Sequence, residues 1–117
     1  MSGPLVYLAV PYSHDDPLIR HARFIEANKA AGKLMSEGLK VFSPISHTHP
    51  IAVECDLPKG WDYWEAFDRA YMEHCHKIIV LCLDGWTESK GIAAELQIAY
   101  ELDLAVEYLE WPINEEV

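Results

Sequence analysis

Short apolar segments alternate with longer amphipathic ones along this sequence. Four segments have the length and the content of β-branched, aliphatic and aromatic residues expected of strands, at 5–10, 39–42, 77–83 and 105–109. Helical spacing of apolar residues predicts helices between them, over 17–37, over 61–75 and from Ser89 onward. Because strands joined by helices run parallel within one sheet, the pattern predicts a single domain over residues 1–117. The expected fold class is a three-layer α/β fold, with a parallel sheet of four to five strands and helices on both faces.

The first predicted helix has clear end signals. Asp16 is a typical N-cap residue, Pro17 suits the first helical position, and Gly38 suits the turn that ends a helix. The face expected to pack in the core consists of Phe24, Ala27, Ala31, Leu34 and Met35.

Residues 43–60 contain three prolines and no regular apolar spacing. We therefore expect a long irregular segment, which in a compact domain is usually functional or partly helical. It follows the C-terminal end of a strand, where open α/β sheets place their ligands. His47 and His49, both in this segment, are candidates for substrate contact.

Glu95 lies in the middle of an apolar stripe on the last predicted helix. The stripe consists of Ile92, Leu96, Ala99 and Leu102. Burying a carboxylate is costly unless it is paired or protonated. A carboxylate at such a position is therefore a candidate catalytic group.

Asp68 repeats this feature on the preceding helix, where it falls on the side of the apolar residues. The strand at 77–83 connects the two helices, so both carboxylates are expected near one crevice. Two carboxyl groups in a semi-apolar cleft can divide labour, because desolvation keeps one protonated while the better-solvated one stays ionised. That arrangement suits cleavage of a glycosidic bond through an oxocarbenium-like transition state. The alternative is structural, since either group could instead accept hydrogen bonds from a loop or pair with an Arg or Lys.

Polar residues in two turns could complete a ligand site. Thr87, Ser89 and Gly91 lie where the last helix begins, and Gly91 would let a ligand approach the backbone closely. Free N–H groups at a helix N-terminus bind anions such as phosphate, although Ser89 could equally serve only as the helix cap. Ser13 and His14 follow the first strand and are expected at the same edge of the sheet.

Aromatic residues could supply a stacking wall for a flat ligand. Those nearest to the predicted crevice are Tyr12, Trp61, Trp64 and Trp86. The helical phase of Trp64 also fits a place in the core.

Composition narrows the class of partner. The chain has 117 residues and a formal net charge of −10, which argues against binding a nucleic acid polymer. No apolar stretch reaches the roughly 20 residues of a membrane span, and the start of the sequence fits a first strand better than a signal peptide. The three cysteines have no framework spacing, so we expect reduced thiols in a cytoplasmic protein. The histidines lack the usual spacing of a zinc site, and we expect neither a metal nor a cofactor.

Several motifs resemble a known family. YLAVPYS at the first strand, an inward Asp on the helix over 61–75, and S-x-G-x-x-x-E on the last helix resemble the nucleoside 2-deoxyribosyltransferase superfamily, which includes 2'-deoxynucleoside 5'-phosphate N-hydrolases. The opening motif and the SPISH sequence resemble most closely its DUF1937 branch, and the likeness covers nearly the whole chain. The resemblance implies a flavodoxin-like fold, a nucleoside or nucleotide as small-molecule substrate, and a homo-oligomer in which a neighbour often completes the pocket.

The resemblance also implies roles for four residues. Glu95 matches the nucleophile that attacks C1' of the deoxyribose, and Asp68 matches the acid near the nucleobase. Tyr7 matches the tyrosine close to the nucleophile, and Ser89 matches the serine that holds the 5'-phosphate. Residues 10–13, VPYS, stand where those hydrolases have a glycine-rich turn.

Three hypotheses about function follow. The first is an enzyme that cleaves an N-glycosidic bond of a nucleoside or nucleotide, as hydrolase or transferase. The second is a non-catalytic nucleotide-binding or sensing module that uses the same cleft. The third is a metal-dependent hydrolase that uses His47, His49 and a carboxylate.

Overall fold

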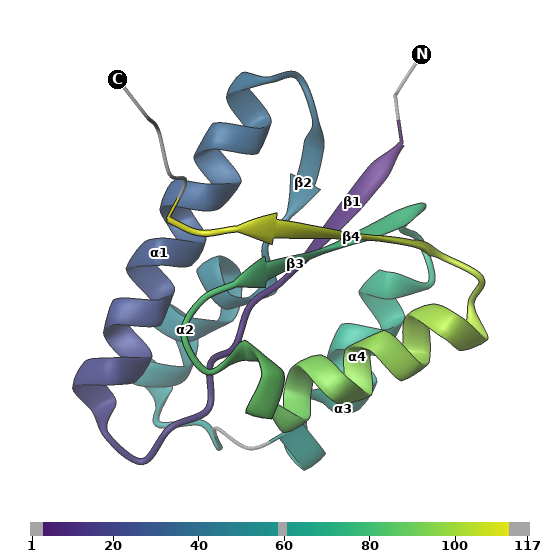
Figure 1. The fold of residues 1–117 in the computed structure, drawn as a ribbon. Coiled ribbons are helices and arrows are strands. Elements are labelled where there is room, and N and C mark those ends of the chain that lie inside the picture. The colour runs from purple at the N-terminus through teal and green to yellow at the C-terminus, as the bar shows by residue number, and fades with distance from the viewer. Residues whose placement is uncertain (1–3, 59–60, 113–117) are drawn as a thin grey trace.

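A sheet of four parallel strands forms the centre of the molecule (Figure 1). The structure is a computed structural model, and it describes residues 4–58 and 61–112. In chain order the elements are β1 (Leu5–Ala9), α1 (Pro17–Ser36), β2 (Lys40–Phe42), α2 (Pro44–Cys55), α3 (Trp61–Met72), β3 (Lys77–Cys82), the 3-10 helix η1 (Trp86–Glu88), α4 (Lys90–Glu101) and β4 (Ala105–Glu110). The predicted class, a three-layer α/β fold with a parallel sheet, is confirmed.

The order of the strands creates a crevice at one edge of the sheet. The order is β2-β1-β3-β4, and Tyr7 of β1 pairs with Phe42 of β2 on one side and Ile78 of β3 on the other. The chain leaves β1 toward one edge, returns, and continues from β3 toward the other edge. Where such a reversal occurs, the loops after the two adjacent strands diverge and leave room for a ligand at the C-terminal ends. The same order begins the flavodoxin-like sheet, in which this crevice lies between the first and third strands.

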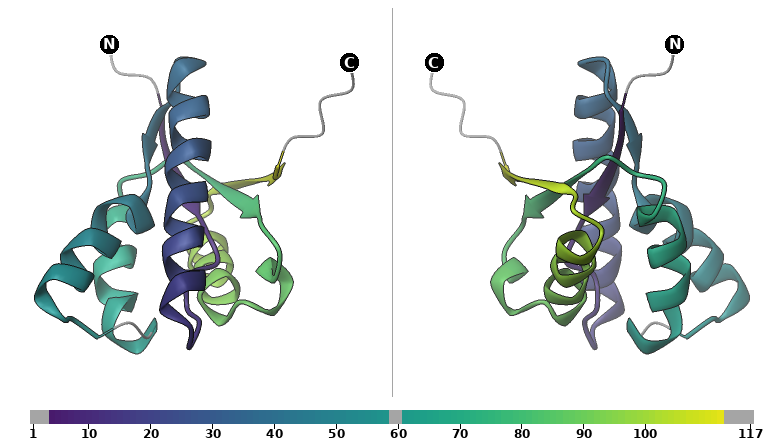
Figure 2. Two further views of the ribbon diagram at one scale, coloured as in Figure 1. Left: turned by 90° about the vertical axis from the view of Figure 1, so that its left-hand side faces the viewer. Right: turned by 90° about the vertical axis from the view of Figure 1, so that its right-hand side faces the viewer.

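Alternate strand residues face two separate cores, as the pleat requires. The core under α1 includes Val6, Leu8, Ile79, Leu81, Ala27 and Leu34. The opposite core, under α3 and α4, includes Tyr7, Ile78, Val80, Met72, Ile92 and Ala99. Figure 1 shows α1 on one side of the sheet and α3 with α4 on the other, and Figure 2 shows α2 and α3 side by side near the β2 edge. This alternation places the Tyr7 side chain on the side of α3 and α4.

The start of α1 forms as its sequence predicts. The Asp16 side chain accepts a hydrogen bond from the Leu18 N–H at 2.9 Å, and Gly38 takes a left-handed φ of 92° just after the helix. The buried positions of the helix are Ala27, Ala30, Ala31 and Leu34. The expectation that Met35 joins this face is wrong, because its side chain is 51% exposed. The four buried positions form one complete helical stripe, and Met35 lies at its border.

Much of the segment 43–60 is helical. Helix α2 covers Pro44–Cys55, and the last two residues of the segment, Lys59 and Gly60, lie outside the described part of the chain. Pro44 stands in the first turn, where a missing N–H costs nothing, while Pro50 removes a single hydrogen bond from the interior. Burial of Thr48, His49 and Ala52 against the rest of the domain offsets that loss. The prolines therefore made this helix hard to predict from the sequence, because its stability comes from tertiary packing.

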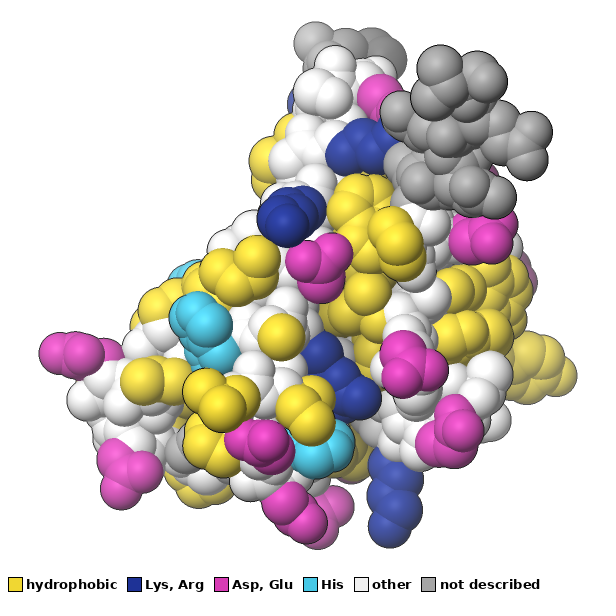
Figure 3. All heavy atoms as spheres, turned by 60° about the vertical axis from the view of Figure 1, so that its left-hand side comes forward, with side chains coloured by type: hydrophobic (Ala, Val, Ile, Leu, Met, Phe, Trp, Pro, Cys, Tyr) yellow, Lys and Arg dark blue, Asp and Glu magenta, His cyan; other side chains and the backbone are white. Residues whose placement is uncertain are grey.

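The surface contains more acidic than basic side chains. On the face in Figure 3, Asp and Glu are scattered, and the Lys and Arg side chains do not gather into one basic patch. Within residues 4–58 and 61–112, no helix is both long enough and apolar enough to cross a membrane.

The two methionines on the helices provide a matched test of the core. Met72 is fully buried between α3 and the sheet, whereas Met35 is 51% exposed. We expect Met72→Ala to lower the free energy of unfolding by about 2–5 kcal/mol, because it leaves a cavity. The control Met35→Ala is expected to change it by less than about 0.5 kcal/mol. Urea unfolding followed by tryptophan fluorescence measures both, and equal effects would contradict the assignment of the core.

Candidate functional site

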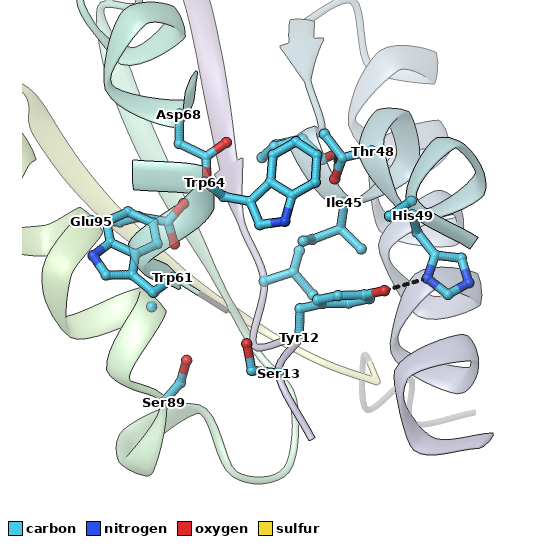
Figure 4. Close-up of a pocket in the computed structure, with 14 residues that line it drawn as sticks. Tyr12, Ser13, Ile45, Thr48, His49, Trp61, Trp64, Asp68, Ser89 and Glu95 are labelled. Carbon is cyan, nitrogen blue, oxygen red and sulfur yellow. Dashed lines mark hydrogen bonds between the residues drawn. The ribbon is translucent and has the colours of Figure 1, made fainter. Parts of the chain in front are cut away.

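A pocket opens at the C-terminal edge of the sheet, between the ends of β1 and β3 (Figure 4). Its walls come from the β1 loop, α2, α3 and the start of α4. The residues that line it are Val10, Tyr12, Ser13, Pro44, Ile45, Thr48, His49, Ala52, Trp61, Trp64, Asp68, Ser89, Gly91 and Glu95. The cavity volume open to water-sized molecules is about 50 Å³, so the pocket is a narrow slot.

Asp68 and Glu95 both line this pocket, although they come from different helices. Glu95 is 5% exposed and Asp68 is 8% exposed. Figure 4 shows the two carboxyl groups on the same side of the pocket, with Trp61 close to Glu95. The sheet positions them jointly, because α3 precedes β3 and α4 follows it.

Tyr7 lies behind the pocket wall and holds Glu95. Its fully buried hydroxyl donates a hydrogen bond to Oε2 of Glu95 at 2.5 Å. Tyr7 belongs to a central strand, so its position is fixed by strands on both sides. The other carboxyl oxygen of Glu95 is not part of this hydrogen bond.

Burial changes the acidity of all three groups. Desolvation raises the pKa of Glu95 to about 8, with the Tyr7 hydrogen bond acting against the shift and the charge of Asp68 adding to it. Desolvation likewise raises the pKa of Asp68 to about 7, again with a hydrogen bond from Tyr7 acting against it. The pKa of Tyr7 lies well above its ordinary value, through burial first and then through the charge of Glu95. Glu95 also senses the charge of Asp68, and both carboxyls titrate near neutral pH.

One structural explanation for the two buried carboxylates is pairing with an Arg or Lys side chain. Among the described residues, no Lys or Arg forms an ion pair with Asp68 or Glu95. Neither group is therefore one half of a buried salt bridge within the described part of the chain. Paired carboxyls with raised pKa values in a pocket are typical of a site for acid–base or nucleophilic chemistry.

The start of α4 forms one end of the pocket. The Ser89 side chain caps the helix by accepting a hydrogen bond from the Ile92 N–H at 3.2 Å. A Cβ added at Gly91 would meet Ser89 and Trp61 only at ordinary contact distances, 3.8 and 3.9 Å. The glycine is therefore not required by packing within the protein, and its role in ligand approach stays a prediction.

Other predicted contact residues divide between this pocket and other places. Tyr12 and Ser13 line the pocket, and Figure 4 draws the Ser13 and Ser89 hydroxyls toward its lower end. His14 is exposed on the β1 loop, where its Nδ1 accepts a hydrogen bond from the Asp16 N–H. His47 lines a separate hollow, with its ring centre 6.1 Å from that of Phe67.

Trp86 belongs to η1 and packs against Tyr108 of β4, with ring centres 5.5 Å apart. It lies outside the pocket, as do His14 and His47. Contact between these three residues and a substrate stays a prediction. Trp64 lines both the pocket and the adjoining hollow, and therefore separates the two.

The α2 wall of the pocket was the least predictable part. His49 is 6% exposed, and its Nδ1 lies 2.6 Å from the Tyr12 hydroxyl (Figure 4). Thr48 is also buried there and donates a hydrogen bond to the Pro44 carbonyl at 2.9 Å. The sequence signal was the histidine pair itself, but only the helical phase of α2 places His49 inward and His47 outward.

Arg23 of α1 connects the two loops that flank the pocket. Its guanidinium donates to the Ser13 carbonyl at 3.1 Å and to the Asp84 carbonyl at 3.5 Å. Ser13 follows β1 and Asp84 follows β3. A Cβ added at Gly85 would lie 3.1 Å from Nη2 of Arg23, so the glycine makes room for this bridge. The sequence offered no pattern that identifies Arg23.

No group of three or more His, Cys, Asp or Glu side chains within residues 4–58 and 61–112 is arranged to hold a metal ion. His47 and His49, the ligands of the third hypothesis, face different hollows.

A protein-family model matches most of this chain. The model of a domain of unknown function, DUF1937, matches residues 4–110. The chain therefore belongs to the DUF1937 family. Comparison with curated proteins finds no match.

The raised pKa values predict how stability depends on pH. In the native state Asp68 keeps its proton up to about pH 7 and Glu95 keeps its proton up to about pH 8, whereas both groups release their protons near pH 4 in the unfolded chain. The native state thus binds more protons in this interval, so stability is highest at acidic pH and falls as pH rises toward 8. The fall is at most about 1.4 kcal/mol per pH unit for one proton. We expect Glu95→Gln to flatten the dependence and to gain stability relative to wild type at pH 8.

Urea unfolding at pH 5, 6, 7 and 8 measures this dependence. The control Glu73→Gln removes an exposed carboxylate at the end of α3 and is expected to follow the wild-type curve. Parallel curves for wild type and Glu95→Gln would contradict the raised pKa of the pair.

Proposed function

We propose that this protein cleaves the N-glycosidic bond of a nucleoside or nucleoside 5'-monophosphate, as an N-hydrolase or a deoxyribosyltransferase. One observation carries the proposal: two buried carboxylates, unpaired with any described cation, open onto a single pocket, and one of them is held by a buried tyrosine. The likeness of the motifs to the nucleoside 2-deoxyribosyltransferase superfamily supports it. The pocket's place at the switch point between β1 and β3 supports a ligand site.

Glu95 acts as the nucleophile in this proposal. The Tyr7 hydroxyl hydrogen-bonds Oε2, which opposes the burial that raises the pKa of Glu95 to about 8 and leaves Oε1 for the attack on C1' of the sugar. The ionised carboxylate that attacks is therefore the minor form at neutral pH, and its share grows as pH rises toward 8. As the Glu95–C1' bond forms, the C1'–N bond breaks and its electron pair passes to the nucleobase. A charged transition state of this kind is stabilised by a carboxylate in a desolvated site.

Asp68 supplies the proton that the departing base needs. Its pKa of about 7 keeps a large share protonated at neutral pH, which suits a general acid. After the base has left, the ionised Asp68 can take a proton from water, or from a second base, which then attacks C1' and releases Glu95. The same residue serves first as acid and then as base, as reversibility requires.

The remaining walls suit the other parts of a nucleotide. Ser89, Gly91 and Ser13 at the lower end of the pocket could bind a 5'-phosphate through hydroxyls and the N-terminal N–H groups of α4. The rings of Trp61 and Trp64 could stack on a flat base. The net charge of −10 favours a small ligand over a nucleic acid polymer.

The test is incubation with a panel of nucleosides, deoxynucleosides and their 5'-monophosphates, with chromatographic detection of free base. We expect wild type to release base from at least one compound. Glu95→Gln is expected to lower the rate about 1,000-fold or more, because the nucleophile is lost. Asp68→Asn is expected to lower it about 100-fold or more.

Glu101→Gln is the matched control, because Glu101 is an exposed carboxylate on the same helix; its rate is expected to stay within about twofold of wild type. Retained activity in Glu95→Gln would exclude this mechanism. Tight binding of a nucleotide in calorimetry without any release of base would favour the non-catalytic module. Size-exclusion chromatography of the same samples tests the proposed homo-oligomer.

A further inference from the structure

A line of three polar side chains runs from the pocket to the surface, away from the carboxylates. The Tyr12 hydroxyl lies 2.6 Å from Nδ1 of His49, and Nε2 of His49 lies 3.4 Å from Nδ1 of His21. Tyr12 and His49 line the pocket, whereas His21 is exposed on α1. None of the three takes part in the proposed chemistry at Glu95.

His49 is firmly held in this line. It is 6% exposed, and its ring stacks on Phe24 with ring centres 4.5 Å apart and an angle of 29°. Both ring nitrogens face polar atoms, so the ring cannot rotate freely without losing these contacts. An apolar side chain could fill the same space without hydrogen-bond partners. Since both ring nitrogens of His49 instead have partners, the residue points to a role beyond packing.

The state of His49 directs the hydrogen of the Tyr12 hydroxyl. If Nδ1 carries a hydrogen, the Tyr12 oxygen accepts it, and the hydroxyl hydrogen is free to point toward a ligand. If Nδ1 carries none, Tyr12 donates to it and offers only a lone pair. Arg20 of α1 adds to this order, because its positive charge acts on the Tyr12 hydroxyl. The polar group at this end of the pocket is therefore oriented rather than free.

The surroundings of Tyr12 define what could meet it. The pocket lining that Figure 4 draws around Tyr12 includes the apolar Ile45, the flat ring of Trp64 and the hydroxyl of Thr48. The small apolar Ala52 also lines the pocket. A flat ring with a hydrogen-bonding group on its edge matches such a slot, since the faces stack and the edge meets the hydroxyl. A phosphate would instead leave these apolar walls unused.

We propose that Tyr12, oriented by His49 and His21, is the specificity-determining contact for the polar edge group of a flat heteroaromatic ring. The ligand class rests on the proposed function, in which that ring is the nucleobase. Tyr12 touches the ligand, and His49 is a positioning residue that acts through Tyr12.

The experiment measures binding, not turnover, in the Glu95→Gln background, by calorimetry. The probes are 2'-deoxyadenosine and 2'-deoxyinosine, each compared with purine 2'-deoxyriboside, which lacks the 6-substituent. 2'-Deoxycytidine is likewise compared with the pyrimidinone deoxyriboside that lacks the 4-amino group. We expect at least one substituted ligand to bind about three- to tenfold more tightly than its unsubstituted partner, the effect of one hydrogen bond.

The variants then separate contact from positioning. Tyr12→Phe keeps the ring and removes the hydroxyl, and His49→Phe keeps the stack on Phe24 and removes both nitrogens. Both are expected to reduce the preference to within about twofold. His49→Asn, which returns a polar atom near Nδ1, is expected to restore part of it. His74→Phe, at an exposed site outside the pocket, is expected to keep the full preference.

Each outcome decides the matter. A preference that survives in His49→Phe shows that His49 is merely structural and overturns its role, and survival in Tyr12→Phe overturns the contact itself. Absence of a preference, or of binding by any probe, overturns the ligand class. Thermal melts confirm that each variant is folded before binding is scored. Failure of the proposed function looks different, because wild type would then release no base even where the binding preference follows these expectations.

Discussion

The hydrogen bond from Tyr7 to Glu95 is the contact on which the site depends. It joins the central strand β1 to helix α4, 88 positions apart in sequence, inside a core that excludes water. Without the hydroxyl, a carboxylate that is 5% exposed would lose a partner that no described cation replaces. Because β1 is fixed by strands on both sides, the bond also fixes where Glu95 points. Burial and this one partner together set the acidity that the proposed chemistry uses.

The pocket has two walls of different character. Helices α3 and α4 contribute the carboxylates, whose raised pKa values come first from desolvation. The β1 loop and α2 contribute hydroxyls, His49 and the ring of Tyr12. Arg23 of α1 bridges the loops after β1 and β3. A ligand that spans the slot would thus meet acid–base groups on one side and hydrogen-bonding groups on the other.

Tertiary packing overrides local signals at two places in this fold. Pro50 argues locally against a helix, yet α2 forms because its buried face, with His49 and Ala52, packs against the domain. Met35 has the apolar character of a core residue, yet it stays at the border of the α1 stripe, where alanines face the sheet. At Pro50, packing offsets a local penalty of about 3 kcal/mol for proline inside a helix. At Met35, the packing of α1 on the sheet decides which apolar side chains are buried.

The sequence by itself determined the α/β class, the four strands and the inward direction of Asp68 and Glu95. Periodicity encodes these features, because a buried face must repeat with the period of its strand or helix. Only the tertiary structure decided that the two carboxylates share one pocket, that Tyr7 reaches Glu95, and that His49 faces Tyr12 while His47 turns away. Arg23 belongs to the same group, since it acts on backbone carbonyls far away along the chain. Such contacts join residues distant in sequence, and no local pattern records them.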